Sequence, residues 1–239
     1  MLGMFFDYIP SAVLMAAAIV PALALMVYVY RQDRVDREPL HLLGLLILYG
    51  IVSTVIAKVL ERVGLFIVQR VAEEKTVLYD VLLYFVVVGF AEEGSKYFLL
   101  CRRTWGLGEF NCRFDGVVYA VAVSLGFALW ENIGYVFMYG LGTALLRAVT
   151  AVPGHACFGV FMGCWYGQAY ALHRQGDEPT SLIFRVFAVV LPALLHGAYD
   201  FLAVTGGYRS QWVFVGFVAA LFLITFALVR RLSQRDRYI

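Results

Sequence analysis

The chain is a series of long apolar blocks separated by short polar intervals. A hydrocarbon core of about 30 Å requires about 20 apolar residues per helix, and windows of that length recur along the whole chain. They predict spans at residues 9–30, 40–57, 78–100, 115–139, 151–172, 182–204 and 211–230. No polar interval is long enough for a soluble domain. The pattern therefore predicts an all-α, polytopic transmembrane bundle of about seven helices, which forms one integral membrane domain over residues 1–239.

Residues 58–76 are amphipathic. Because they could form a helix of their own, the predicted helix count stays open between seven and eight. Lys58 and Arg62 fall near one helical face, and Phe66 and Ile67 fall on another. The segment predicts either a helix that lies in the membrane interface or the end of the second span running out into water.

The positions of lysine and arginine predict the orientation of the bundle. With the N-terminus outside, the cytoplasmic side collects Arg31, Arg34, Arg37, Arg102, Arg103, Arg113, Arg174, Arg230, Arg231, Arg235 and Arg237. The outside then collects only Lys58, Arg62, Arg70, Lys75, Arg147 and Arg209. We therefore expect the N-terminus outside and the C-terminus inside, which agrees with an odd number of spans.

Composition supports a membrane protein and argues against other classes. Charged residues make up 15% of the chain, against about a quarter in soluble domains. The net charge of +2 offers no electrostatic case for nucleic acid. The N-terminus lacks a basic segment and carries Asp7, so it predicts a first membrane helix rather than a cleaved signal. No cysteine lies in a CxxC pair, which indicates packing roles rather than a zinc ribbon or disulfides for Cys101, Cys112, Cys157 and Cys164.

Ionisable side chains inside the predicted spans are the main functional signal. A charge at mid-bilayer costs at least ~2.5–3.5 kcal/mol, so each one requires an explanation. The middle spans contain Glu92, Glu93, Lys96, Glu131, His155, His196 and Asp200. Packing explains poorly why several helices would each carry such residues. We therefore interpret the set as one active site.

Helical spacing groups these residues further. Glu92 and Lys96 are one turn apart, so a carboxylate and an ammonium share a helical face. His196 and Asp200 have the same spacing, which suits an imidazole oriented by a carboxylate or two ligands of one metal. His155 heads a stripe of small residues at every fourth position, formed by Gly159, Gly163 and Gly167. Such stripes let helix backbones approach closely in lipid, so we expect His155 on a packed face.

Structural roles stay open for single residues. A glutamate–lysine pair can be a packing device alone, Asn132 can bond to a neighbouring helix, and Asp115 can cap the start of its own helix. The histidines at the predicted interfaces, His41 and His173, indicate no function.

Taken together, these motifs resemble the PrsW family of membrane-embedded bacterial proteases, whose named member starts the degradation of an anti-sigma factor. The matching pieces, over about residues 85–203, are Glu92-Glu93-x-x-Lys96, Asp115-Gly116, Phe127-x-x-x-Glu131-Asn132, His155 with its glycines, and His196-x-x-x-Asp200. The pattern is also similar to that of the CAAX prenyl endopeptidases. The resemblance implies a multi-pass protein of the bacterial plasma membrane that acts on a single-pass membrane protein. It indicates no oligomeric state.

The resemblance also implies roles for the residues of the site. Glu92, Glu93, His155 and His196 would be catalytic. The supporting residues would be Lys96, Asp115, Glu131, Asn132 and Asp200. The segments 1–80 and 205–239 match no motif, so substrate choice is not implied.

The cofactor stays open between none and zinc. Hydrolysis requires a water, a base and groups that stabilise an oxyanion, and glutamates with two histidines can supply the last two. Alternatively, a Zn²⁺ ion could be held by His155, His196, Glu92 and Asp200. The family is classified with metallopeptidases, but no HExxH spacing signals zinc. We favour metal-independent glutamate chemistry.

The predicted function is an intramembrane endopeptidase that cuts its substrate near the outer face of the membrane. Glu131, His155 and His196 lie outward of their span midpoints by roughly 6–10 Å, and only Glu92 lies inward. Two alternatives use the same residues, namely an ion- or proton-coupled transporter and a non-catalytic scaffold of the same fold.

Overall fold

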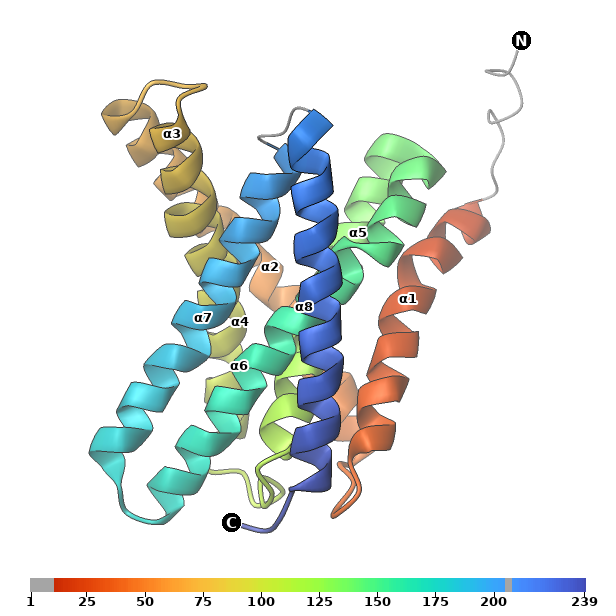
Figure 1. Cartoon of the computed structure of the whole chain (residues 1–239). Coiled ribbons are helices and arrows are strands. Elements are labelled where there is room, and N and C mark those ends of the chain that lie inside the picture. Colours follow the sequence, from red (N-terminus) through yellow and green to blue (C-terminus); the bar gives the residue numbers. More distant parts are fainter. Residues whose placement is uncertain (1–10, 205–207) are drawn as a thin grey trace.

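The computed structural model describes residues 11–204 and 208–239, and this part of the chain is a bundle of long helices (Figure 1). The elements are α1 (Ser11–Gln32), α2 (Leu40–Val71), α3 (Val77–Val81), the π-helix η1 (Leu82–Val88), α4 (Gly89–Thr104), α5 (Asp115–Val149), α6 (Ala151–Arg174), α7 (Glu178–Val204) and α8 (Tyr208–Gln234). The all-helical prediction is therefore confirmed.

The predicted spans coincide with these helices, apart from residues 9 and 10 of the first span, which lie outside the described residues. Within the described residues, five stretches are long and apolar enough to cross a membrane, and one of them, residues 115–174, comprises both α5 and α6. The third predicted span is the continuous run of α3, η1 and α4. The count of seven crossings and the orientation stay predictions.

The amphipathic segment 58–76 is mostly a continuation of the second predicted span. Helix α2 runs without interruption from Leu40 to Val71, and the C-cap residue that follows it, Ala72, has an extended backbone. Residues 58–71 therefore form no separate helix. The last turns of α2 project from the bundle beside α3 (Figure 1).

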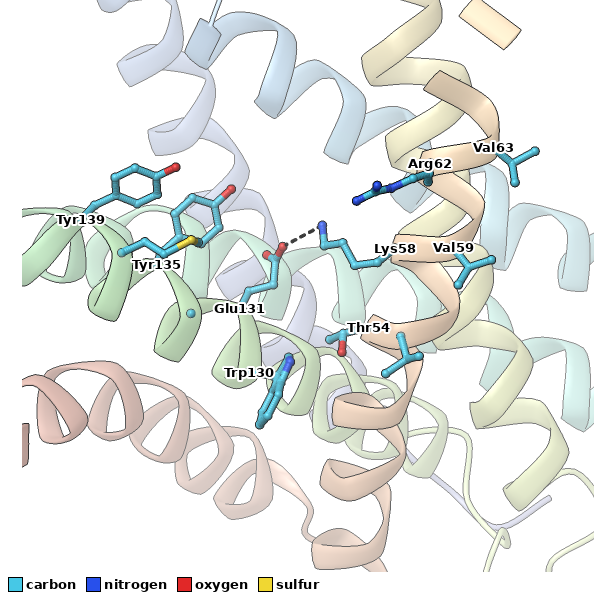
Figure 2. Close-up of a pocket in the computed structure, with 12 residues that line it drawn as sticks. Thr54, Lys58, Val59, Arg62, Val63, Trp130, Glu131, Tyr135 and Tyr139 are labelled. Atoms are coloured by element: carbon cyan, nitrogen blue, oxygen red, sulfur yellow. Dashed lines mark ion pairs between the residues drawn. The ribbon is translucent and has the colours of Figure 1, made fainter. Parts of the chain in front are cut away.

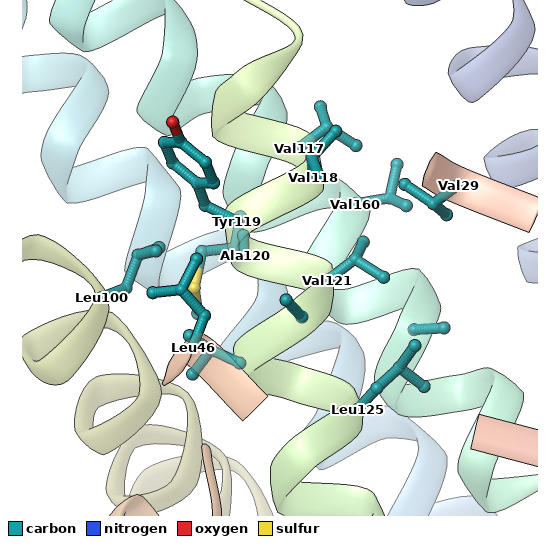
Figure 3. Close-up of a cluster of buried hydrophobic side chains, with 14 of the residues drawn as sticks. Val29, Leu46, Leu100, Val117, Val118, Tyr119, Ala120, Val121, Leu125 and Val160 are labelled. Atoms are coloured by element: carbon teal, nitrogen blue, oxygen red, sulfur yellow. The ribbon is translucent and has the colours of Figure 1, made fainter. Parts of the chain in front are cut away.

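Helix α5 is the centre of the bundle. Every residue from Asp115 to Ala128 is buried, which is typical of a helix that is apolar on all sides and enclosed by other helices. Its valines and leucines pack against Leu46 of α2, Leu100 of α4 and Val160 of α6 (Figure 3). At Gly140 the backbone leaves the helical conformation with a φ of 80°, close to the predicted end of this span at residue 139.

The glycine stripe on α6 lies on a packed face, as the sequence predicted, and the helix that it packs against is α5. A Cβ atom on Gly163 would lie 2.4 Å from the carbonyl oxygen of Gly116, and one on Gly167 would lie 2.1 Å from that of Arg113. Both distances are far below a van der Waals contact. Glycine is therefore required here because the two backbones touch.

The same device joins α5 to α2. A Cβ atom on Gly50 would lie 2.0 Å from the carbonyl oxygen of Val123, and one on Gly126 would lie 2.1 Å from that of Ile47. Helix α5 is thus held between α2 and α6 at backbone contact. Because the backbones are this close, polar side chains on α2, α5 and α6 can reach one another one to two helical turns away from the glycine contacts.

We predict that Gly163→Ala lowers the stability of the bundle by about 1–3 kcal/mol, because the added methyl group must push two backbones apart. Thermal unfolding of the purified protein in detergent measures the change. Gly216→Ala on α8 is the matched control, since a Cβ atom there meets nothing within 4 Å. Equal melting temperatures for the two variants would contradict the close α5–α6 contact.

Candidate functional site

Lys96 of α4 is the centre of the polar cluster. Its side chain is 0% exposed, and its Nζ atom lies 2.7 Å from Glu93 Oε1 and 3.4 Å from Glu92 Oε2. The ammonium group also donates to Nδ1 of His155 on α6 at 3.1 Å and lies 4.0 Å from the centre of the Phe127 ring on α5. Both carboxylates and the histidine are thus held by one buried cation.

His196 of α7 completes the cluster from the opposite side. Its Nδ1 atom lies 2.9 Å from Glu93 Oε1, and its Nε2 atom lies 3.8 Å from Glu92 Oε2 and 3.6 Å from Asp200 Oδ2. The imidazole stacks on Phe158 with ring centres 4.8 Å apart. The carboxylate of Glu93 therefore orients His196, while the other ring nitrogen faces Glu92.

Glu131 of α5 forms a second layer of charge. It lies 3.2 Å from His155 Nε2, 3.2 Å from Arg147 Nη2 and 3.6 Å from Lys58 Nζ. Figure 2 shows Lys58 of α2 directed across to Glu131. Both nitrogens of His155 are thus engaged, one by Lys96 and the other by Glu131.

A cavity of about 310 Å³ opens onto these groups. Its wall includes Glu92, Glu131, His155, His196 and Asp200, but neither Glu93 nor Lys96. Three tyrosines, Tyr84, Tyr135 and Tyr199, also line it. Glu92 is therefore the glutamate of the pair that a molecule in the cavity can reach, and Glu93 is behind it.

A larger cavity of about 770 Å³ lies beside the first, between α2 and α5 (Figure 2). Apolar side chains of both helices, among them Val59, Val63 and Trp130, form much of its wall. The two cavities share Lys58, Glu131 and Tyr135. The Lys58–Glu131 ion pair thus stands between an apolar groove and the polar cluster.

The donors of the cluster fit a divalent metal ion. One ligand atom each from Glu92, Glu93, His155 and His196 lies within 4.8 Å of the other three. Two imidazoles and two carboxylates are a donor set that zinc accepts, and Glu93 Oε2 is buried without a hydrogen-bond partner. The set contains Glu93 where the sequence suggested Asp200, because Asp200 is further out on the cavity wall.

Two of the supporting residues lie away from the cluster. Asn132 points to α1, where its Nδ2 atom donates to the carbonyl oxygen of Ala18 at 3.3 Å, so the structural alternative holds. Asp115 is at the start of α5, 16 residues or about 24 Å from Glu131. Its Oδ2 atom accepts from the backbone amides of Asn111 and Cys112, so it holds the preceding loop and does not cap its own helix.

Lys58 and Arg147 contact the site although the sequence placed both in polar intervals outside the spans. Each is at the end of an apolar block, where a positive charge is ordinarily assigned to the membrane surface. The helices continue past these positions, and both side chains are directed toward Glu131. Of the two residues, only Lys58 lies in a segment whose amphipathic pattern indicated that its side chain would face one particular direction.

The π-helix η1 ends four residues before Glu92. Its wider turn sets the rotation of the following helix, and such segments often occur at functional sites. Gly89 follows it at once, and a Cβ atom there would lie 2.4 Å from the carbonyl oxygen of Ala193 on α7. Helix α4 can therefore approach α7 closely enough for Glu93 to reach His196.

Comparison with known proteins places the chain among membrane proteases. A family model described as PrsW family intramembrane metalloprotease matches residues 38–229. "Protease PrsW" of Bacillus subtilis (strain 168) is 32% identical over 93% of this chain and 96% of the relative. "Protease PrsW" of Clostridioides difficile (strain 630) is 36% identical over 77% of this chain and 76% of the relative. No solved structure matches the chain.

We predict that Lys96→Met destabilises the protein by about 3–5 kcal/mol, because it leaves two buried carboxylates without their cation. Chemical or thermal unfolding in detergent measures the loss. Lys58→Met is the control, since the Lys58 side chain is 57% exposed and its ion pairs contribute only about 0–1 kcal/mol. A Lys96 variant as stable as the Lys58 variant would show that the ammonium does not hold the cluster.

Proposed function

The chain belongs to the PrsW family of intramembrane metalloproteases, and we propose that it hydrolyses a single-pass membrane protein near the outer face of the bacterial plasma membrane. The observation that carries the proposal is the cavity whose wall includes Glu92, His155 and His196. Family membership makes the chain a membrane-embedded protease, so we do not pursue the transporter or the scaffold.

We assign the general base to Glu92. It lines the cavity, and its Oε2 atom faces Nε2 of His196 at 3.8 Å, so a water placed beside both could lose a proton to the carboxylate. His196, protonated on both ring nitrogens, would then donate a hydrogen bond from Nε2 to the oxyanion of the attacked carbonyl. His155, whose nitrogens are held by Lys96 and Glu131, would line the cavity beside it. The proton held on Glu92 is available for the leaving amine.

Glu93 and Lys96 act behind these groups as positioning residues. Glu93 holds His196 through Nδ1, which leaves Nε2 directed toward the cavity. Lys96 neutralises Glu93 and fixes Nδ1 of His155. Preorganised groups of this kind need not rearrange when charge develops, which is the main source of their effect.

A divalent ion would be held by Glu92, Glu93, His155 and His196, and when bound it would act as a Lewis acid toward the water and the carbonyl oxygen. The family description and this donor set support the ion against the metal-free chemistry that the sequence favoured. With the ion bound, His155 and His196 would serve as its ligands rather than as hydrogen-bond donors, and Lys96 would keep its position behind the cluster.

The substrate would approach sideways from the lipid through the groove between α2 and α5. A membrane-anchored segment is apolar, and so is much of the groove wall, which includes Val59, Val63 and Trp130. Lys58 and Glu131 would have to separate to admit a peptide into the polar cavity. Lys58 also pairs with Glu61 at 2.9 Å, so its ammonium keeps a carboxylate partner when it leaves Glu131.

The cut would fall in the outer juxtamembrane part of the substrate. The cavity wall includes Ala151 at the start of α6 and Val204 at the end of α7, which is the end of the bundle opposite the C-terminus (Figure 1). With the N-terminus outside, this end is the outer one. Such a cut would be the first step of a regulated proteolysis, for which an anti-sigma factor is the substrate that we propose.

We predict that Glu92→Gln, Glu93→Gln, His155→Ala and His196→Ala each reduce cleavage by at least about 100-fold, the usual contribution of a proton-transferring group. The assay co-expresses the protease with the single-pass anti-sigma factor of the same cell, tagged at both ends, and follows the fragments on blots. His41→Ala on the exposed side of α2 is the control and should cleave normally. Normal turnover in two or more folded site variants would refute the assignment.

We expect the cleaved bond to lie on the non-cytoplasmic flank of the substrate's membrane segment, because the cavity opens at that end of the bundle. Mass spectrometry of the fragments identifies the bond. A cut in the cytoplasmic flank by an otherwise active protein would show that the orientation, rather than the catalytic assignment, is wrong.

A further inference from the structure

A second group of metal-binding side chains converges at the end of the bundle that carries the C-terminus. Cys112 comes from the connection between α4 and α5, Asp115 begins α5, and Asp236 lies in the tail after α8. One ligand atom of each lies within 4.8 Å of the other two. Cys112 and Asp115 are both 0% exposed. The group is far from the catalytic cavity and belongs to no step of the proposed reaction.

Both carboxylates are oriented so that one oxygen is held and the other is free. Asp115 Oδ2 accepts from the backbone amides of Asn111 at 2.9 Å and Cys112 at 2.6 Å, and Asp236 Oδ1 accepts from that of Phe114 at 3.0 Å. Asp115 Oδ1 and Asp236 Oδ2 are buried without a hydrogen-bond partner. Hydrogen bonds to the second atom of a ligand are the usual way in which proteins fix a metal-binding carboxylate.

Negative charge gathers around these atoms without a paired cation. The carboxylate of Glu38, 3% exposed, faces Asp115, and its Oε2 atom also has no hydrogen-bond partner. Among residues 11–204 and 208–239, no lysine, arginine or histidine forms an ion pair with Glu38, Asp115 or Asp236, although Arg113 attracts Asp236 from further away. Each buried carboxylate without a paired cation destabilises the folded protein by several kcal/mol unless a proton or a cation neutralises it.

We propose that Cys112, Asp115 and Asp236 bind a structural Zn²⁺ ion beside the buried carboxylate of Glu38. Thiolate and carboxylate oxygen are both zinc ligands, whereas calcium and magnesium take oxygen alone. The proposal replaces the packing role that the sequence suggested for Cys112.

The ion would fasten the C-terminal tail to the start of the central helix. The tail already lies against the α4–α5 connection, where Tyr238 pairs with Cys112 and the Ile239 amide donates to the carbonyl oxygen of Asn111 at 2.9 Å. A zinc ion shared by α5, this connection and the tail would hold the three segments together. It would act on the stability of this end of the bundle rather than on the chemistry at the other.

The test is the zinc content of the purified full-length protein, measured by plasma mass spectrometry in a His196→Ala background. That background removes a catalytic ligand, so the difference from wild type reports the ion of the catalytic cluster separately. We expect one zinc per chain in the background protein and none after Cys112→Ser or Asp236→Asn. Cys164→Ser and Asp80→Asn, which lie elsewhere, should keep it.

Cobalt gives a readout in the background protein itself, before any substitution at the proposed site. Co²⁺ added to the background protein should produce the near-ultraviolet charge-transfer absorption of a thiolate ligand, which the catalytic cluster cannot give because it contains no cysteine. Loss of this band in Cys112→Ser, but not in Cys164→Ser, would support the site. A folded background protein without stoichiometric zinc and without the cobalt band would overturn it and would mean that protons neutralise the carboxylates.

Discussion

The arrangement of the core helices depends on the buried ammonium group of Lys96. An ion removed from water must be paired, and Lys96 meets this requirement with Glu92 and Glu93 on its own helix, His155 on α6 and the Phe127 ring on α5. A shift of any of these helices by one turn, about 5.4 Å, would leave at least one charge unpaired. The cluster therefore sets the register of three helices, and His196 extends that constraint to α7.

Contact between backbones makes this arrangement possible. Side chains as short as glutamate and histidine can meet across three helices only where the helix axes lie close together. Gly163 and Gly167 on α6 and Gly50 on α2 provide that approach on the two sides of α5. Gly89 and Gly197 provide it between the run of η1 and α4 and helix α7. The glycines carry no chemistry themselves, but the polar cluster could not form without them.

Helix α5 connects two regions that differ in character. Near its middle it carries Glu131, which joins the catalytic layer, and at its start it carries Asp115, which holds the loop before it. Both residues belong to the pattern that resembles the protease family, yet about 24 Å of helix separates them. The resemblance thus joined residues of two separate sites. If the second site holds zinc, the same helix carries the catalytic layer near its middle and a metal-fastened tail at its start.

The sequence by itself determined the class of fold, the position of nearly every long helix and the membership of Glu92, Glu93, His155 and His196 in one cluster. It could do so because lipid penalises charge and exposed backbone, so that apolar length and buried polar residues carry information that survives without the tertiary structure. Only the tertiary structure decided which glutamate faces the cavity, that Lys58 and Arg147 turn inward, and that Asp115 and Asn132 serve other contacts. These outcomes depend on helix rotation, which the π-helix η1 and the closeness of neighbouring helices set, and neither is a local property of the chain.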